Sequence, residues 1–346
     1  RRDRIIREAE EIWSDILQDD GKTTERFLVW HYTAVLGKKT KSIEKISLRE
    51  QYECDIFQCL NQREISMDAQ EEMLDKLKQL HLNVRMCRRL EKGEFPVKCN
   101  NENINLLFSI LICNMKNIFV IPIYLHIFEC YTEKKAMSII ELLTPMLAKT
   151  YFQAKRLGRA ADESVRKCYL EIWNKIGEEK VSMEAIKEIL EKLLKKGKHE
   201  EEFNRKIEQD IFERNTGNFE AKFLLLMIEL QYLKEGEKSR ADFGDDSVKI
   251  VFDKLSIEHI LHKSISADEV SSDQYASIHK IGNLTLLGEK INSREDDRSF
   301  EEKREDYLLS PYVITRKVGE LKVWKYKEFK ERQEELTQVL KRAFAL

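Results

Sequence analysis

Four short fragments near the carboxyl end determine how this chain is interpreted: I-E-H-I at 257–260, I-G-N-L-T-L-L at 281–287, K-I-N at 290–292 and F-E-E-K at 300–303. The first two lie in stretches that have the length and composition of short strands, and the last opens a stretch with helical spacing. The order strand, loop, strand and helix predicts a compact α+β unit. We expect strands at 248–252, 255–261 and 281–287 and helices at 299–309 and 325–344.

The rest of the chain favours helices over sheets. Only 12 Gly and 4 Pro punctuate 346 residues, and apolar residues recur at three- and four-residue spacing. We therefore predict a mainly α protein with an all-α domain at 1–235 and a small α+β unit at 236–346, closed by a C-terminal helix. The helices expected in the first part cover 5–16, 65–90, 104–115, 118–131, 134–157, 163–176, 182–196, 201–214 and 218–234.

The composition indicates the cellular environment of the protein more clearly than its function. The net charge of −2 gives no global electrostatic case for nucleic acid, so any DNA contact needs a local basic face. Seven Cys without a C-x-x-C pair predict reduced, mostly buried thiols of a cytoplasmic protein. The most apolar stretch, 105–128, is interrupted by polar residues and a proline, which indicates a buried helical pair and no membrane span.

The fragments carry residue types that suit metal-assisted cutting of a phosphodiester. A neutral imidazole such as that of His259 can take a proton from water near pH 7. Oxygen ligands from Glu258 and Asn292 suit Mg²⁺ or Mn²⁺, which stabilises charge on the leaving oxygen. Neighbouring strand residues point to opposite faces, so Glu258 and His259 can share a site only if the strand twists or ends there.

The combined pattern resembles the HNH (ββα-metal) nuclease module at the carboxyl end of GmrSD-type, modification-dependent restriction enzymes. The resemblance rests on I-E-H-I-L-H at 257–262, G-N-L-T-L-L at 282–287 and Asn292, followed by matching residues from about 300 to the end. Those later matches are Phe300, Lys303, Tyr307, Ser310, Trp324 and Arg332. The family usually has Pro where this chain has His262, a departure that removes no ligand or base.

The resemblance implies a role for each site residue. Glu258 and Asn292 would hold one Mg²⁺ or Mn²⁺ ion, and His259 would be the general base. Asn283 would brace the loop that presents His259 through hydrogen bonds to the backbone. Lys303 would lie near the scissile phosphate or fix the helix of the motif.

The helical part is similar to the middle region of the same family, through W-S-D-I-L at 13–17 and R-F-L-V-W-H-Y at 26–32. The family's amino-terminal nucleotide-hydrolysing module has no counterpart in this sequence, so we expect a fragment or one part of a split system. Foreign, modified DNA, a partner subunit carrying that module and further copies of the chain are the partners that the resemblance implies.

Several histidines, basic residues and aromatics also have simpler interpretations than a role in catalysis. His259, His262 and His279 could bind zinc, but their spacing is not that of a helical zinc site. We expect His262 and His279 to be surface residues. The basic residues could form a phosphate-binding rim or a solvated face, and they are Lys280, Lys290, Arg294, Arg298, Lys303 and Arg304. Six aromatics are expected in the core, namely Trp30, Tyr32, Phe119, Tyr124, Phe128 and Tyr151.

The sequence therefore favours a metal-dependent DNA endonuclease of a defence system. Water deprotonated by His259 would attack in line and leave a 5′-phosphate and a 3′-hydroxyl. A single unit would nick one strand. The alternatives are an inactive unit that serves as a helical scaffold for a partner subunit, and an RNA-cutting toxin that uses the same residues.

Overall fold

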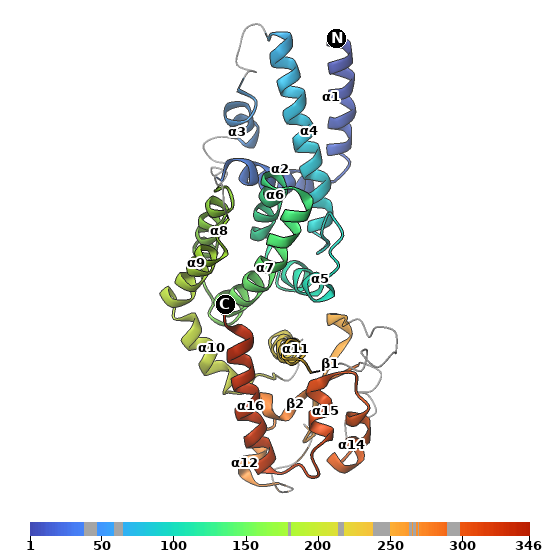
Figure 1. The fold of residues 1–346 in the computed structure, drawn as a ribbon, viewed down its shortest axis with the longest axis vertical. Helices are drawn as coiled ribbons and strands as arrows, with labels where there is room; N and C mark the ends of the chain where they lie inside the picture. The colour runs from blue at the N-terminus through green and yellow to red at the C-terminus, as the bar shows by residue number, and fades with distance from the viewer. Residues whose placement is uncertain are drawn as a thin grey trace. The chain divides into compact units, whose positions relative to one another are not determined.

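The computed structural model describes residues 1–37, 47–58, 65–178, 181–213, 218–237, 250–262, 265, 268, 270–288 and 298–346. Helices dominate these residues, and their β structure is one two-stranded sheet and an isolated bridge, so the mainly α prediction is confirmed. The chain forms two compact units: unit 1 comprises 1–148 and 161–193, and unit 2 comprises 149–160 and 194–346. Figure 1 labels the elements of both.

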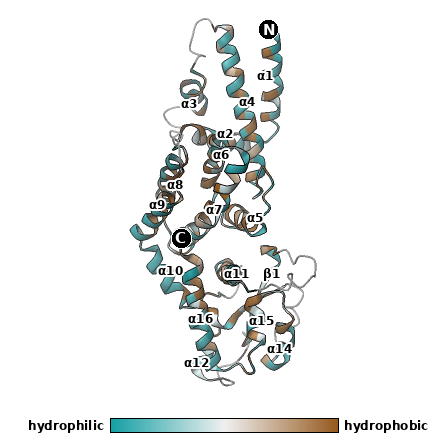
Figure 2. Ribbon diagram, viewed as in Figure 1, coloured by the Kyte–Doolittle hydropathy of each residue, from teal (hydrophilic) through white to brown (hydrophobic). Residues whose placement is uncertain are grey.

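Unit 1 is built from helices with polar outer faces. Along α1 and α4 the hydrophobic and hydrophilic residues alternate (Figure 2), and the two helices lie side by side (Figure 1). Its helices are α1 (Arg2–Ile16), α2 (Gly21–Leu36), α3 (Leu48–Asp55), α4 (Met67–Leu90), α5 (Glu102–Ser109), α6 (Ile121–Cys130), α7 (Glu133–Tyr151), α8 (Asp162–Ile176) and α9 (Met183–Lys196), of which α7 and α9 continue into unit 2.

The apolar stretch predicted to be a buried helical pair is confirmed as such. It forms α5, the π-helical turn Ile110–Asn114, the 3-10 turn Ile118–Val120 and α6, and most of its apolar side chains are buried. No single described helix has the length and apolarity to cross a membrane. This bent pair passes that test by length and composition only.

Buried polar groups tie α2, α4 and α6 together in unit 1. The side-chain amide nitrogen of Asn83 lies 2.9 Å from Nδ1 of His31 and donates to Oε1 of Glu129 at 2.6 Å. Burial lowers the pKa of His31 to about 4, so the imidazole is neutral at neutral pH. The folded state therefore requires an uncharged His31.

Unit 2 is organised around α11, a largely apolar helix without a distinct polar face. It packs against both strands and against two later helices, which explains why it lacks a polar face. The elements of unit 2 are the π-helical turn Phe152–Leu157, α10 (His199–Ile207), α11 (Phe219–Lys234), β1 (Leu255–His259), α12 (Ser272–Tyr275), β2 (Leu284–Gly288), α14 (Phe300–Leu308), α15 (Val313–Gly319) and α16 (Tyr326–Phe344).

The expected helices at 299–309 and 325–344 are confirmed, whereas the strand predictions need correction. No strand is assigned to the described residues of the stretch predicted at 248–252, where Phe252 begins the 3-10 turn Phe252–Lys254, and residues 248–249 lie outside the described residues. β1 begins where predicted but ends two residues earlier, at His259. Ile281–Asn283 is a 3-10 turn, so β2 begins only at Leu284. The compact units also divide the chain differently from the boundary expected at residue 235. Helices α10 and α11 belong with the residues after 250, because α11 packs on both strands.

Candidate functional site

The site is built where β1 ends. β1 and β2 pair antiparallel, with Glu258 opposite Thr285 and His259 opposite Leu284. Beyond the strand, the amide of Ile260 donates to the carbonyl of Asn283 at 2.9 Å. His259 is therefore the last strand residue, which meets the condition that the strand must end near the Glu258–His259 pair.

Glu258 faces α14. Its Oε1 accepts hydrogen bonds from Nζ of Lys303 at 2.6 Å and from the hydroxyl of Tyr307 at 3.2 Å. The side chain of Lys303 is 0% exposed and that of Glu258 is 2% exposed, so this is a buried ion pair. A buried carboxylate needs such partners to remain charged, and these fix its position at the end of β1.

Lys303 also binds the backbone of the strand end. Its Nζ donates to the carbonyl of His259 at 3.2 Å, which joins α14 to β1. Of the two roles expected for Lys303, this arrangement corresponds to fixing the helix of the motif. Its part in catalysis stays a prediction.

His259 faces a different group of residues. Its Nε2 lies 3.4 Å from Nδ1 of His279, and its ring meets the ring of Phe212 edge to face, with centroids 4.5 Å apart. Phe212 also stacks on His279. The amides of Ile211 and Phe212 donate to the carbonyl of His279, which holds this group together. The imidazole of His259 is thus confined between an aromatic ring and a second imidazole.

Asn283 is the brace between the two sides of the site. Its Nδ2 donates to the carbonyls of Leu261 and Ile278, at 2.9 and 3.0 Å. Its Oδ1 accepts from the amide of Leu261 at 2.8 Å and from the indole of Trp324 at 3.2 Å. The contacts with the backbone just after His259 are those that the sequence resemblance implied, although a catalytic role for Asn283 stays a prediction.

The closing helix α16 supports the turn that carries Asn283. Nη1 of Arg332 donates to the carbonyls of Gly282 at 2.6 Å and Leu284 at 2.9 Å, and Gln333 accepts from the amide of Gly282 at 2.7 Å. A Cβ at Gly282 would lie 2.8 Å from the ring of Phe329, so this close approach requires glycine. Burial lowers the pKa of Arg332 to about 10, which keeps it charged at neutral pH.

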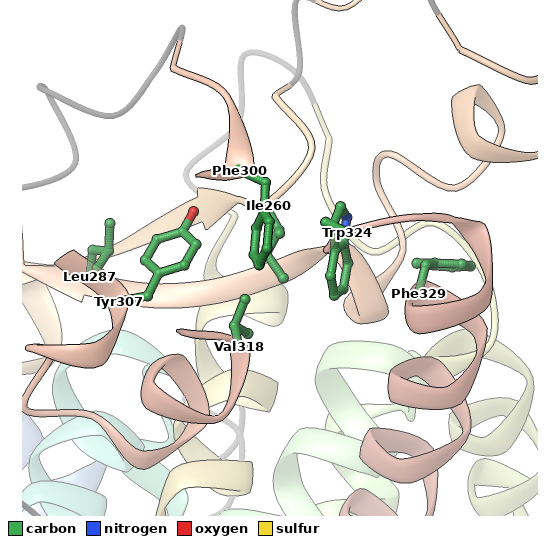
Figure 3. Packing of buried hydrophobic residues seen from close by; sticks show 7 residues of the cluster. All are labelled: Ile260, Leu287, Phe300, Tyr307, Val318, Trp324 and Phe329. Atoms are coloured by element: carbon green, nitrogen blue, oxygen red, sulfur yellow. The ribbon is translucent and has the colours of Figure 1, made fainter. Parts of the chain in front are cut away.

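A hydrophobic cluster joins these elements behind the polar groups. Figure 3 shows its side chains in a row, with Phe300 and Tyr307 from α14 and Val318 from α15, followed by Trp324 and Phe329. Ile260 and Leu287 complete the cluster. Its packing fixes α14 and α16, and through them the side chains that hold Glu258 and Asn283.

Of the two expected metal ligands, Glu258 lies within the described part of the chain. Asn292 lies outside the described residues, and the described residues contain no group of three or more His, Cys, Asp and Glu side chains that could hold a metal ion. Glu258 fits the chemistry that Mg²⁺ or Mn²⁺ requires, because it offers hard carboxylate oxygens in a fixed position.

Some of the basic residues that could form a phosphate-binding rim lie among the described residues. Lys303 is buried, and Arg304 donates through Nε to the carbonyls of Gly319 and Leu321, at 3.0 and 2.8 Å. Arg298 pairs with Asp306. These three residues serve the fold in this structure, and Lys290 and Arg294 lie outside the described residues.

Two histidines expected on the surface are half-buried, and one of them is part of the site. His279 contacts His259, although the sequence analysis treated it as a surface residue. The antiparallel register could have located it, because residues just before β2 lie beside residues just after β1. Phe212 comes from a distant part of the chain, and no pattern in the sequence indicated its role.

His262 is half-buried, and its Nδ1 has no hydrogen-bond partner among the described residues.

These observations define the class of protein: a helical chain with a small two-stranded sheet that presents an acidic residue and a histidine beside a bracing asparagine. Residues 197–339 match the family model for the C-terminal domain of GmrSD restriction endonucleases. The match covers less than half of the chain, and it makes this part similar to a domain of restriction endonucleases, which are nucleases in the broad sense. No curated protein matches the chain significantly.

Proposed function

We propose that the chain is a metal-dependent endonuclease of a restriction system, that it cuts foreign DNA, and that its site is of the HNH (ββα-metal) type. The observation that carries this proposal is the end of β1. There Glu258 and His259 are the last two residues of the strand, and Asn283 is hydrogen-bonded to the backbone that follows them. The order β1, β2, α14 and the family match of residues 197–339 support the same assignment.

In the proposed mechanism the residues of this chain have separate tasks. His259 takes a proton from the attacking water, and His279 orients its ring through the contact between Nε2 and Nδ1. Glu258 and Asn292 would hold one Mg²⁺ or Mn²⁺ ion, which when bound supplies positive charge for the leaving 3′-oxygen. Lys303 and Tyr307 keep the carboxylate of Glu258 in place.

Supercoiled plasmid tests this proposal. We expect nicking in the presence of Mg²⁺ or Mn²⁺, loss of nicking with a chelator, and a decrease of at least about 100-fold for His259→Ala, the scale of general-base catalysis. His81→Ala is the matched control, since His81 is a half-buried histidine of unit 1 that pairs with Asp15. Cutting that persists unchanged in His259→Ala would refute the general-base assignment.

The buried ion pair of Glu258 and the burial of His259 also suit a non-catalytic scaffold for a partner subunit. Failure of the wild-type chain to cut DNA or RNA with either metal ion would favour that alternative. Parallel DNA and RNA substrates separate a DNA nuclease from an RNA-cutting toxin.

The orienting role of His279 has its own test. His279→Ala should lower kcat while KM for DNA stays within about twofold, and His279→Gln should recover part of kcat because glutamine can still hydrogen-bond to an imidazole. Equal losses in the two variants would mean that the ring only fills space.

A further inference from the structure

A cavity of about 400 Å³ in unit 1 has no part in the function proposed above. It lies between one face of α2, the turn that leads into α6, and one face of α8. The volume falls in the range of small-molecule binding pockets, about 300–1,000 Å³. The residues that line it are Lys22, Glu25, Arg26, Val29, Trp30, Thr33, Ile118, Phe119, Pro122, Ile123, Arg166, Tyr169, Leu170 and Trp173.

The walls of the cavity are aromatic and aliphatic. Trp30 is almost fully buried, as expected for a core aromatic, and so is Tyr169. Both nevertheless border the cavity, as does the half-buried Phe119. Flat aromatic surfaces of this kind accept a flat aromatic ligand by stacking.

The charged residues of the lining are mainly basic. Lys22 and Arg166 are exposed, and the guanidinium of Arg166 lies 4.4 Å from the centroid of the Phe119 ring. Arg26 is held by Glu91, but its Nε is buried and has no acceptor among the described residues. Among the described residues that line the cavity, Glu25 alone is acidic. The cavity therefore combines aromatic walls with an excess of positive charge.

We propose that this cavity binds a nucleotide, with the base against the aromatic wall and the phosphate at Lys22 and Arg166. A purely apolar ligand would leave the basic residues without a function, and inorganic phosphate alone would leave the aromatic surface in water. A nucleobase carrying a phosphate satisfies both sets of residues. It can come from a free nucleotide or from one unit of a nucleic-acid strand.

Isothermal titration of the full chain with four purine and pyrimidine mononucleotides, their nucleosides and inorganic phosphate tests the proposal. At least one mononucleotide should bind, and it should bind more tightly than its nucleoside or inorganic phosphate. Arg166→Ala and Lys22→Ala should each weaken binding about tenfold or more, as expected for a lost charge-assisted hydrogen bond. Lys167→Ala is the matched control, because Lys167 is an exposed neighbour that does not line the cavity, and it should change affinity less than twofold.

Glu25→Gln provides a test with the opposite sign. Removal of the acidic group from the lining should strengthen binding of a mononucleotide, by about twofold or more at low salt. A single-stranded oligonucleotide and a blunt duplex are titrated in parallel. If only the oligonucleotide binds, with the same dependence on Arg166 and Lys22, then the ligand is a unit of a strand.

The proposal is overturned if no mononucleotide or strand binds, if the nucleoside binds as tightly as its nucleotide, or if Arg166→Ala and Lys22→Ala leave affinity unchanged. Circular dichroism of each variant confirms that the helices are intact. The result is independent of the nuclease assay, since none of these substitutions touches Glu258, His259 or Asn283.

Discussion

Removal of either member of the buried pair between Glu258 and Lys303 should destabilise the protein strongly. Nζ of Lys303 lies 2.6 Å from Oε1 of Glu258, and both side chains are almost completely removed from solvent. Lys303→Met would remove the cation that neutralises this carboxylate, while the hydroxyl of Tyr307 would still donate to Oε1. Loss of one partner from a buried ion pair costs about 3–5 kcal/mol, because the other charge remains buried without compensation.

Replacement of both partners should behave differently. Glu258→Gln alone leaves an uncompensated ammonium group and should cost a similar amount. The double variant, Glu258→Gln with Lys303→Met, buries no charge and should recover stability to within about 2 kcal/mol of the wild-type chain. A double-mutant cycle then gives a coupling energy of at least about 2 kcal/mol. Nuclease activity should not recover with stability, because Glu258 is the proposed metal ligand.

Urea unfolding in the presence of a chelator, followed by circular dichroism, measures these free energies. The pair between Lys76 and Glu72 is a matched control, since its nitrogen and oxygen are also 2.6 Å apart but lie on the surface of α4. Lys76→Met should cost about 0.5 kcal/mol or less. If Lys303→Met costs no more than Lys76→Met, then the pair is not buried as the structure places it.

Three further predictions concern other parts of the molecule. Since burial holds the pKa of His31 at about 4 and the unfolded value is near 6.5, the unfolding free energy should be at its full value above pH 6.5. It should fall by up to about 3 kcal/mol as the pH decreases to 4, and urea unfolding of His31→Gln should show a smaller slope. Gly282→Ala should lower the unfolding free energy by about 1–3 kcal/mol because its Cβ would strike Phe329. Gly288→Ala, whose Cβ would meet no atom of the described residues within 4 Å, should change it by less than about 0.5 kcal/mol. Asn283→Ala should lower nicking by at least about tenfold, and retention of full activity would contradict its bracing role.

The secondary-structure elements of the site could be predicted, because local sequence patterns determine them. The alternation of 255–259 and the apolar run of 284–288 located both strands, and the serine-led helix at 300–308 was placed to within a residue at each end. The strand ends were overestimated, because a 3-10 turn and a strand share apolar residues and differ only in backbone angles. The bracing contacts of Asn283 with the backbone of Leu261 followed from the resemblance, since these residues are 22 positions apart and no local pattern relates them.

Contacts between distant segments were not predictable from one sequence. Phe212 reaches His259 because the amides of Ile211 and Phe212 donate to the carbonyl of His279. The periodicity of the sequence does not predict this contact. The burial of Lys303 was similarly hidden, because a lysine in a charged helical stretch is usually exposed. The helix α15 was missed because it is short and lies between a Pro and a Gly, which are usual signs of a loop.

The sheet cannot by itself give the site its geometry. A pair of five-residue strands is marginal in isolation, so the positions of Glu258 and His259 must be set by what packs around them. Lys303 fixes one side from α14, and Arg332 and Trp324 fix the turn that carries Asn283 on the other. It follows that substitutions in α16 that touch no substrate should impair cutting as strongly as they impair folding, whereas substitutions on the exposed face of α12 should impair neither.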